Sequence, residues 1–209
     1  MLDPNKPLYK YMKSEFAQKV ISEGTFRIGT LYEFQNEEKH GAAIGDSEEG
    51  TKYVRNGPNE TYDYSVPGSV PAFVKNFIRA EEGMHVKIEG IQMQQTVRCP
   101  DFYLYCVTSE VCPKAMAEFE CDTVIKISEP VKFFSGLADG LLQKVKISDN
   151  FYIVPCIYRD RANNYSENDR THPATIKDHR YDYQKEVRAI WEPTGGIVEP
   201  LIVQSKMAA

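Results

Sequence analysis

The segment Glu-Val-Arg-Ala-Ile-Trp at residues 186–191 limits the possible folds more than any other part of this chain. Successive side chains of a β-strand point to opposite faces, so Val187, Ala189 and Trp191 share one face. This apolar face is predicted to pack on the core. Glu186 then starts the strand on the other face, where we expect it to contact solvent.

Gln184 stands two residues before Glu186, so in an extended chain both side chains lie on the same face. A glutamine and a carboxylate at the start of a strand can hold a polar ligand, and a carboxylate can stabilise nearby positive charge. The simpler interpretation is a surface glutamate that pairs with Arg188, because charged strand residues are mostly solvated. Taken alone, the pattern favours this simpler interpretation.

The predicted elements alternate without a regular strand–helix–strand order. Strands are predicted at residues 8–12, 25–28, 102–109, 123–127, 151–158, 186–191 and 197–203, and residues 84–97 form a long strand or a hairpin turning near Gly90. Helices are predicted at residues 14–22 with Ser14 as N-cap, at 70–80 and at 113–120, and residues 130–142 form a helix or a strand followed by a helix. This arrangement predicts an α+β fold with mostly antiparallel, split sheets and flanking helices.

Length and charge narrow the class of protein. A chain of 209 residues favours one domain, residues 1–209, here with a long, irregular polar excursion at about residues 32–66. The net charge of −5 argues against broad nucleic-acid binding. No apolar run reaches the roughly 18 residues of a membrane span, and the first residues lack the apolar core of a signal peptide. We therefore expect a cytoplasmic protein that does not bind membranes.

Familiar catalytic and metal-binding motifs are absent from the sequence. It contains no P-loop, G-x-G-x-x-G, H-E-x-x-H or G-x-S-x-G segment, and its four histidines are scattered. The five cysteines form no C-x-x-C pair, which argues against structural zinc and a disulfide framework. We therefore expect no metal site.

Two further groups of side chains stand at predicted strand ends. Tyr9 and Tyr11 share one face of the first strand, and Lys10 lies on the other. Thr108 and Ser109 end the apolar strand at residues 102–109, where their hydroxyls can bond a ligand or cap the next helix. The tyrosines alternatively serve as amphipathic core residues.

Arg27, on the second predicted strand, adds a cation that can meet a phosphate. Its alternative role is an ordinary surface ion pair. Together with Glu186 and the two groups above, it completes the set of candidate binding residues at strand ends.

The segments Leu8-Tyr-Lys-Tyr11, Gly24-Thr-Phe-Arg27 and Tyr183-Gln-Lys-Glu-Val-Arg188 resemble, in this order, the ADP-ribosyltransferase superfamily. More closely, the chain resembles a family of uncharacterised bacterial and phage proteins related to that fold. The resemblance implies that Glu186 is catalytic, with Gln184 as its companion. It also implies that Thr108 and Ser109 form part of the strand that braces the site.

The resemblance further implies NAD as the bound nucleotide, with nicotinamide between aromatic side chains drawn from Tyr9, Tyr11, Tyr32 and Phe34. Cleavage of the nicotinamide–ribose bond gives the ribose positive character, which a carboxylate stabilises. Lys10 stands where one branch of the superfamily has histidine, and a charged lysine cannot accept a hydrogen bond.

Three functions therefore remain open. The first is an NAD-dependent ADP-ribosyltransferase or NAD glycohydrolase, acting as a toxin or a phage–host conflict factor on an acceptor that the sequence does not identify. The second is a non-catalytic module that kept the fold and binds a nucleotide or a protein. The third is a nuclease or other metal enzyme that uses acidic loop residues. Glu186 and Gln184 favour the first function, and Lys10 favours the second.

Overall fold

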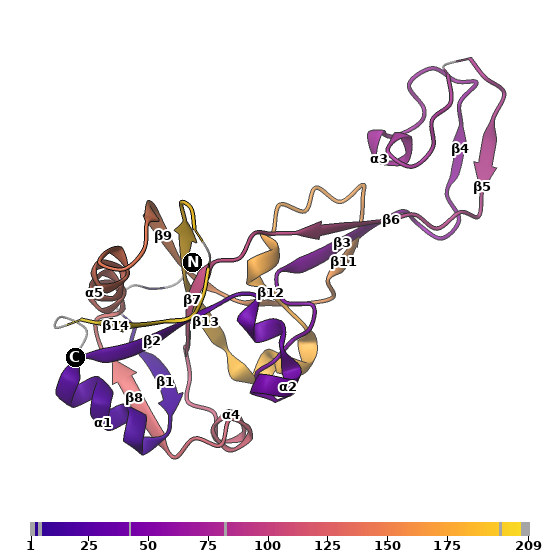
Figure 1. The fold of residues 1–209 in the computed structure, drawn as a ribbon. Helices are drawn as coiled ribbons and strands as arrows, with labels where there is room; N and C mark the ends of the chain where they lie inside the picture. The colour runs from indigo at the N-terminus through magenta and orange to yellow at the C-terminus, as the bar shows by residue number, and fades with distance from the viewer. Residues whose placement is uncertain (1–2, 4–5, 42, 82, 197, 206–209) are drawn as a thin grey trace.

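The computed structural model describes residue 3 and residues 6–41, 43–81, 83–196 and 198–205. The fold is α+β, as predicted, and its main sheet of seven strands is antiparallel throughout (Figure 1). Five of its strands follow one another in the order β14 (Leu201–Gln204), β2 (Thr25–Thr30), β7 (Tyr103–Thr108), β1 (Leu8–Met12) and β8 (Thr123–Ile127). The other two strands are β13 (Glu186–Pro193), which pairs with β7, and β9 (Ile147–Pro155), which pairs with β13. Strand β7, which is apolar almost throughout, lies in the middle of this sheet.

Strand β7 is bordered differently on its two edges. Along one edge it pairs with β13 over six residues, from Glu186↔Thr108 to Trp191↔Tyr103. The other edge is shared, because β2 pairs only at Leu104 and Tyr103 and β1 pairs only at Thr108. Strands β1 and β2 therefore separate over the middle of β7, and helix α1 (Ser14–Glu23) connects them. We call this separation the fork.

Helix α1 begins one residue earlier than predicted from its cap. Ser14 is the first helical residue, and the cap comes from Asp122, whose carboxylate accepts the Ser14 backbone N–H at 2.6 Å. Sequence spacing could not reveal a cap that lies 108 residues away. Gly24 ends the helix as predicted, with the left-handed φ of 62° that glycine adopts without strain.

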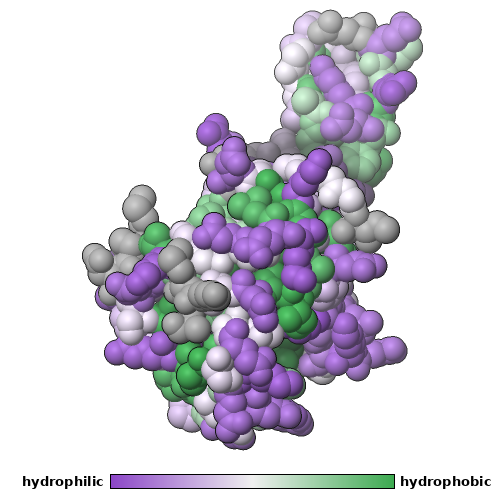
Figure 2. All heavy atoms as spheres, turned by 60° about the vertical axis from the view of Figure 1, so that its left-hand side comes forward, coloured by the Kyte–Doolittle hydropathy of each residue, from purple (hydrophilic) through white to green (hydrophobic). Residues whose placement is uncertain are grey.

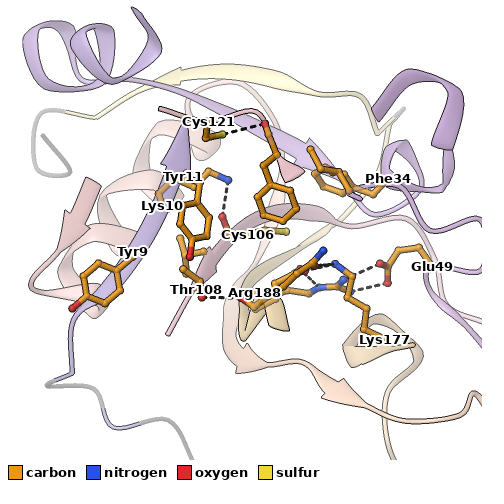
Figure 3. Close-up of a pocket in the computed structure, with 15 residues that line it drawn as sticks. Tyr9, Lys10, Tyr11, Phe34, Glu49, Cys106, Thr108, Cys121, Lys177 and Arg188 are labelled. Carbon is orange, nitrogen blue, oxygen red and sulfur yellow. Dashed lines mark hydrogen bonds and ion pairs between the residues drawn. The ribbon is translucent and has the colours of Figure 1, made fainter. Parts of the chain in front are cut away.

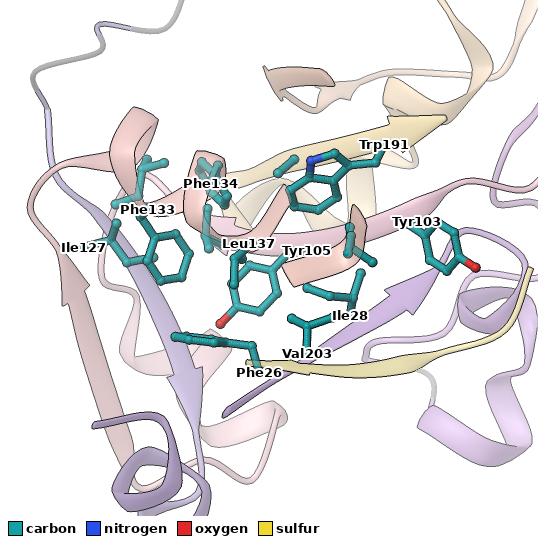
Figure 4. Close-up of a cluster of buried hydrophobic side chains, with 14 of the residues drawn as sticks. Phe26, Ile28, Tyr103, Tyr105, Ile127, Phe133, Phe134, Leu137, Trp191 and Val203 are labelled. Atoms are coloured by element: carbon teal, nitrogen blue, oxygen red, sulfur yellow. The ribbon is translucent and has the colours of Figure 1, made fainter. Parts of the chain in front are cut away.

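The main core lies between the sheet and helix α5 (Pro130–Leu142). Phe134, Leu137 and Trp191 are fully buried in it, and Figure 4 shows them packed with side chains from β2, β7 and β14. Val187 and Ala189 belong to the same cluster, so the predicted apolar face of β13 is confirmed. Burial of this large aromatic and aliphatic surface anchors β13 in the middle of the molecule.

The segment between β2 and β7 is more regular than predicted. It contains η1 (Glu33–Gln35), α2 (Glu37–His40), β3 (Thr51–Arg55), β4 (Thr61–Asp63), α3 (Ala72–Lys75), β5 (Lys87–Glu89) and β6 (Gln94–Arg98). The predicted helix at residues 70–80 is thus only one turn. Residues 84–97 form neither one strand nor a hairpin, because β5 pairs with β4 and β6 pairs with β3.

Residues 56–93 form an outer lobe that stands away from the main body (Figures 1 and 2). It has its own apolar cluster, which includes Tyr62, Phe73 and Ile88. The connection to the body runs through β3 and β6, which form a small sheet with β11 (Ala162–Asn164). Tyr165 stacks on Phe73 with ring centroids 5.1 Å apart, which fixes the lobe to the segment after β11.

The remaining elements surround the start of β13. They are α4 (Pro113–Glu118), β10 (Ile157–Tyr158), η2 (Pro173–Thr175), β12 (Ile176–Lys177) and η3 (His179–Gln184). Strands β10 and β12 form a short parallel pair. The polar stretch at residues 159–178 therefore contains strand residues as well as the helical turn η2.

Candidate functional site

A pocket lies beside the start of β13, on the sheet face opposite α5 (Figure 3). Tyr9, Tyr11 and Thr108 contribute from β1 and β7, and Phe34 and Phe119 add aromatic walls from η1 and the end of α4. The cavity volume is about 150 Å³, whereas whole ligands usually occupy pockets of roughly 300–1,000 Å³. The pocket can therefore hold one ring-sized group.

The floor of the pocket is a charge network of five side chains: Glu49, Lys177, Gln184, Glu186 and Arg188. Lys177 Nζ donates to Glu186 Oε2 at 2.5 Å and to Gln184 Oε1 at 2.6 Å. Arg188 Nε donates to Glu186 Oε1 at 2.7 Å, and its two terminal nitrogens hold both oxygens of Glu49 at 2.7 and 2.8 Å. Both carboxylate oxygens of Glu186 are thus bonded to cations.

Glu186 is only 8% exposed, so the expectation of a solvated strand end is wrong. The alternative partner, Arg188, is correct, but the pair is buried instead of lying on the surface. The physical reason is a second cation, Lys177 of β12. Its side chain covers the face of Glu186 that was expected to contact solvent.

The protonation states of the network follow from its packing. Burial alone would raise the pKa of Glu186, but the charges of Arg188 and Lys177 outweigh burial and hold that pKa well below its ordinary value. Burial would lower the pKa of Lys177, and the Glu186 charge reverses this, so the lysine pKa is raised. Glu186 is therefore a carboxylate and Lys177 an ammonium at neutral pH.

Gln184 reaches the network by a route that strand alternation does not describe. It is the last residue of η3, and Lys185 follows in the left-handed region with φ 43° before β13 begins. Its amide donates to the Ala43 carbonyl at 2.7 Å while its oxygen accepts from Lys177. Gln184 therefore meets Glu186 through Lys177, not along one strand face.

Lys10 supplies a third cation. Its Nζ donates to the Cys106 carbonyl at 2.7 Å and lies 4.9 Å from the centre of the Tyr105 ring. Within the described part of the chain it forms no ion pair. The pocket is therefore lined by three cations, Lys10, Lys177 and Arg188, against the two carboxylates Glu49 and Glu186. This local positive excess contrasts with the net charge of −5 of the whole chain.

Tyr11 and Thr108 have structural partners. The Tyr11 hydroxyl accepts the Cys112 N–H at 2.6 Å, and its ring meets Phe119 edge-on with centroids 5.9 Å apart. Thr108 Oγ1 lies 2.7 Å from the Glu110 carbonyl oxygen and 2.8 Å from that of Gln184. The hydroxyl thus joins β7 to the turn before β13 and does not cap α4.

Three predicted site residues lie outside the pocket lining. The Tyr32 hydroxyl donates to the Cys99 carbonyl at 2.6 Å. Ser109 is exposed, with its hydroxyl 3.3 Å from the Lys185 carbonyl. Arg27 forms an ion pair with Glu33, which is its predicted alternative role.

Glu49 and Lys177 are the members of the network that sequence reasoning missed. Glu49 lies in a polar, glycine-containing stretch that is typical of a loop, and it is 139 residues from Arg188. Lys177 lies in a segment predicted as a polar loop. No local pattern connects either residue to the start of β13.

No family model, curated protein or solved structure matches the chain. Among the described residues, no group of three or more His, Cys, Asp or Glu side chains is arranged to hold a metal ion, and the five cysteines are free thiols. Over the same residues, the helices are too short or too polar to cross a membrane.

Proposed function

We propose that the pocket binds the nicotinamide end of NAD and that the chain is a non-catalytic nucleotide-binding module with ADP-ribosyltransferase-like architecture. One observation carries the non-catalytic assignment: both carboxylate oxygens of Glu186 are bonded to the buried cations Lys177 and Arg188. In NAD cleavage a carboxylate acts by stabilising the developing positive charge, and cations bonded to that carboxylate weaken this stabilisation. Here two positive charges lie within hydrogen-bond distance of that carboxylate.

The cost of freeing Glu186 supports the same conclusion. Both Lys177 and Glu186 are buried, and separating them costs free energy, because the Lys177 ammonium then loses its carboxylate partner in a low-dielectric environment. A substrate would have to supply this free energy before any transition-state stabilisation could begin. Binding without cleavage makes no such demand.

Aromatic walls and positive charge support a nucleotide as the ligand. Phe34, Phe119 and Tyr11 present ring surface to the pocket, and Lys10 offers a charge that no carboxylate compensates among the described residues. A flat heteroaromatic ring attached to an anionic group matches both features. The cavity volume of about 150 Å³ suits the ring alone.

The arrangement of strands supports the ADP-ribosyltransferase-like architecture. Thr108 pairs with Tyr9 of β1 on one side and with Glu186 of β13 on the other, so the three residues form one row across the sheet. The order of the three segments in the resembled superfamily predicts this convergence. The fork beside the row gives the sheet its split form.

The same row favours a second candidate function, which is NAD cleavage by an ADP-ribosyltransferase or NAD glycohydrolase. A toxin or phage–host conflict role belongs to this candidate. It requires Lys177 to leave Glu186 when NAD and an acceptor bind. The two candidates differ in one measurable product, because only the second releases nicotinamide.

Isothermal titration of NAD into the purified protein tests the proposal. Phe119 is partly buried at the end of a short helix, so Phe119→Ala should fold and weaken NAD binding about tenfold, given that one aromatic contact is worth about 0.5–1.5 kcal/mol beyond its buried area. The matched control is Phe77→Ala on the outer lobe, which should leave affinity unchanged. Equal affinities for both variants, or no binding by the parent, would contradict the proposal.

A further inference from the structure

A second cavity, of about 530 Å³, lies in the fork between β1 and β2. Helix α1 covers it, Tyr105 of β7 contributes from the sheet, and Ile202 of β14 lies at its edge. Lys10 lines both this fork cavity and the pocket. The charged side chain occupies the place where β1 and β7 no longer pair, and it bonds the Cys106 carbonyl there.

The fork cavity carries an excess of positive charge. Its lining contains Lys10, Lys19 and Arg27 but only one carboxylate, Glu23. Arg27 is compensated by Glu33, whereas Lys10 and Lys19 form no ion pair within the described residues. Lys19 is exposed on α1 and can therefore turn toward a ligand without leaving a buried partner.

The rest of the fork cavity is apolar. Val20 and Phe26 form buried parts of the lining, and Phe16 and Ile202 are about half exposed beside them, at 50% and 52%. An apolar surface edged by cations fits a ring system that carries phosphate, since the ring gains from burial and the phosphate from charge.

We infer that the fork cavity binds the phosphates and the second ring of a dinucleotide whose first ring occupies the pocket. This inference rests on the proposed function. Lys10 is the reason for a ligand of two parts, because it lines both cavities. The pocket alone is too small for a complete nucleotide, whereas the fork cavity, at about 530 Å³, has the usual size of a ligand site. The bridging phosphates lie at Lys10, and Lys19 is the specificity-determining residue that distinguishes a dinucleotide from a mononucleotide.

Titration calorimetry with NAD and with nicotinamide mononucleotide tests the inference. In the parent protein, NAD should bind at least tenfold more tightly than the mononucleotide, because only NAD reaches the fork cavity. Lys19→Ala should weaken NAD binding about fivefold and leave mononucleotide binding unchanged. The control, Lys132→Ala, removes another exposed lysine, on α5 and outside both cavity linings, and should change neither affinity.

Two results would overturn the inference while leaving the proposed function intact. One is equal affinity of the parent for NAD and the mononucleotide, and the other is an NAD affinity that Lys19→Ala does not change. If neither nucleotide binds, the proposed function fails, and inorganic pyrophosphate then tests the fork cavity by itself. Broadening of its phosphorus resonance by the parent but not by Lys19→Ala would support an anion site in the fork, and equal spectra would end the inference.

Discussion

The two faces of β13 are buried equally well but by different means. On one face Val187, Ala189 and Trp191 pack into the main core. On the other face Glu186 and Arg188 are just as inaccessible, yet every charge there is matched by a partner. Well-packed apolar residues would stabilise the second face at least as well as buried ion pairs do. The comparison supports the proposal that the charged face is a site, since stability alone does not explain its composition.

The largest effect should come from unpairing a charge on this face. Glu49→Ala leaves Arg188 with only Glu186 as a carboxylate partner in a buried position, and we expect a loss of about 3–5 kcal/mol in the free energy of unfolding. Urea denaturation measures the change. Glu38→Ala, at an exposed position on α2, is the control and should stay within about 0.5 kcal/mol. If the Glu49→Ala protein is as stable as its control, the charge network does not stabilise the fold as described.

Trp191→Ala tests the apolar face. The side chain is fully buried and stacks on Phe151 with centroids 6.0 Å apart, so truncation leaves a cavity and should cost about 3–5 kcal/mol. The affinity of the folded protein for NAD should nevertheless remain that of the parent, whereas Glu49→Ala should reduce it. Equal effects of the two variants on NAD affinity would show that the faces do not differ in function.

Glu186→Gln should have a smaller effect, about 3 kcal/mol, because glutamine keeps one acceptor oxygen but turns a donor toward one of the two cations. The solvated position expected from the sequence implied a mild effect, and burial changes that expectation. Thermal unfolding of the variant and the parent measures it. A melting temperature equal to that of the parent would mean that the cations do not depend on this carboxylate.

The contribution of Glu186 to stability should also depend on pH. The pKa of Glu186 is lowered in the folded state from an unfolded value of about 4.3, so its contribution is complete above that value and is lost as the pH falls toward the folded pKa. Between about pH 5 and 3 the parent should therefore lose stability more steeply than Glu186→Gln. Other carboxylates titrate in both proteins, so the difference isolates Glu186. Parallel curves would contradict the assigned ion pairs.

Local sequence patterns predicted those strands and helices whose own residues determine where they form. The apolar run of β7, the alternation in β13 and the Pro130 start of α5 each carry their own signal. Strands β5 and β6 were not separated, because the partners that divide them, β4 and β3, lie outside the segment.

The site shows the same division between local and distant causes. Strand order and the resemblance brought Tyr9, Thr108 and Glu186 together, and the structure places them in one row. The burial of Glu186 depends on Lys177, which reaches it from a strand of two residues, and on Arg188, which Glu49 in turn bonds from a loop. The sequence around Glu186 predicts its pairing with Arg188 but gives no sign of the second cation, Lys177.

Simultaneous measurement of NAD binding and nicotinamide release tests the central claim most directly. The parent protein should bind NAD saturably and release no nicotinamide above a protein-free control, because Lys177 and Arg188 compensate the charge of Glu186. Lys177→Met, which keeps the apolar length of the side chain but removes one of the two cations, should be the variant in which release begins. Repeated turnover of NAD by the parent protein, at a rate that Lys177→Met does not increase, would contradict the account.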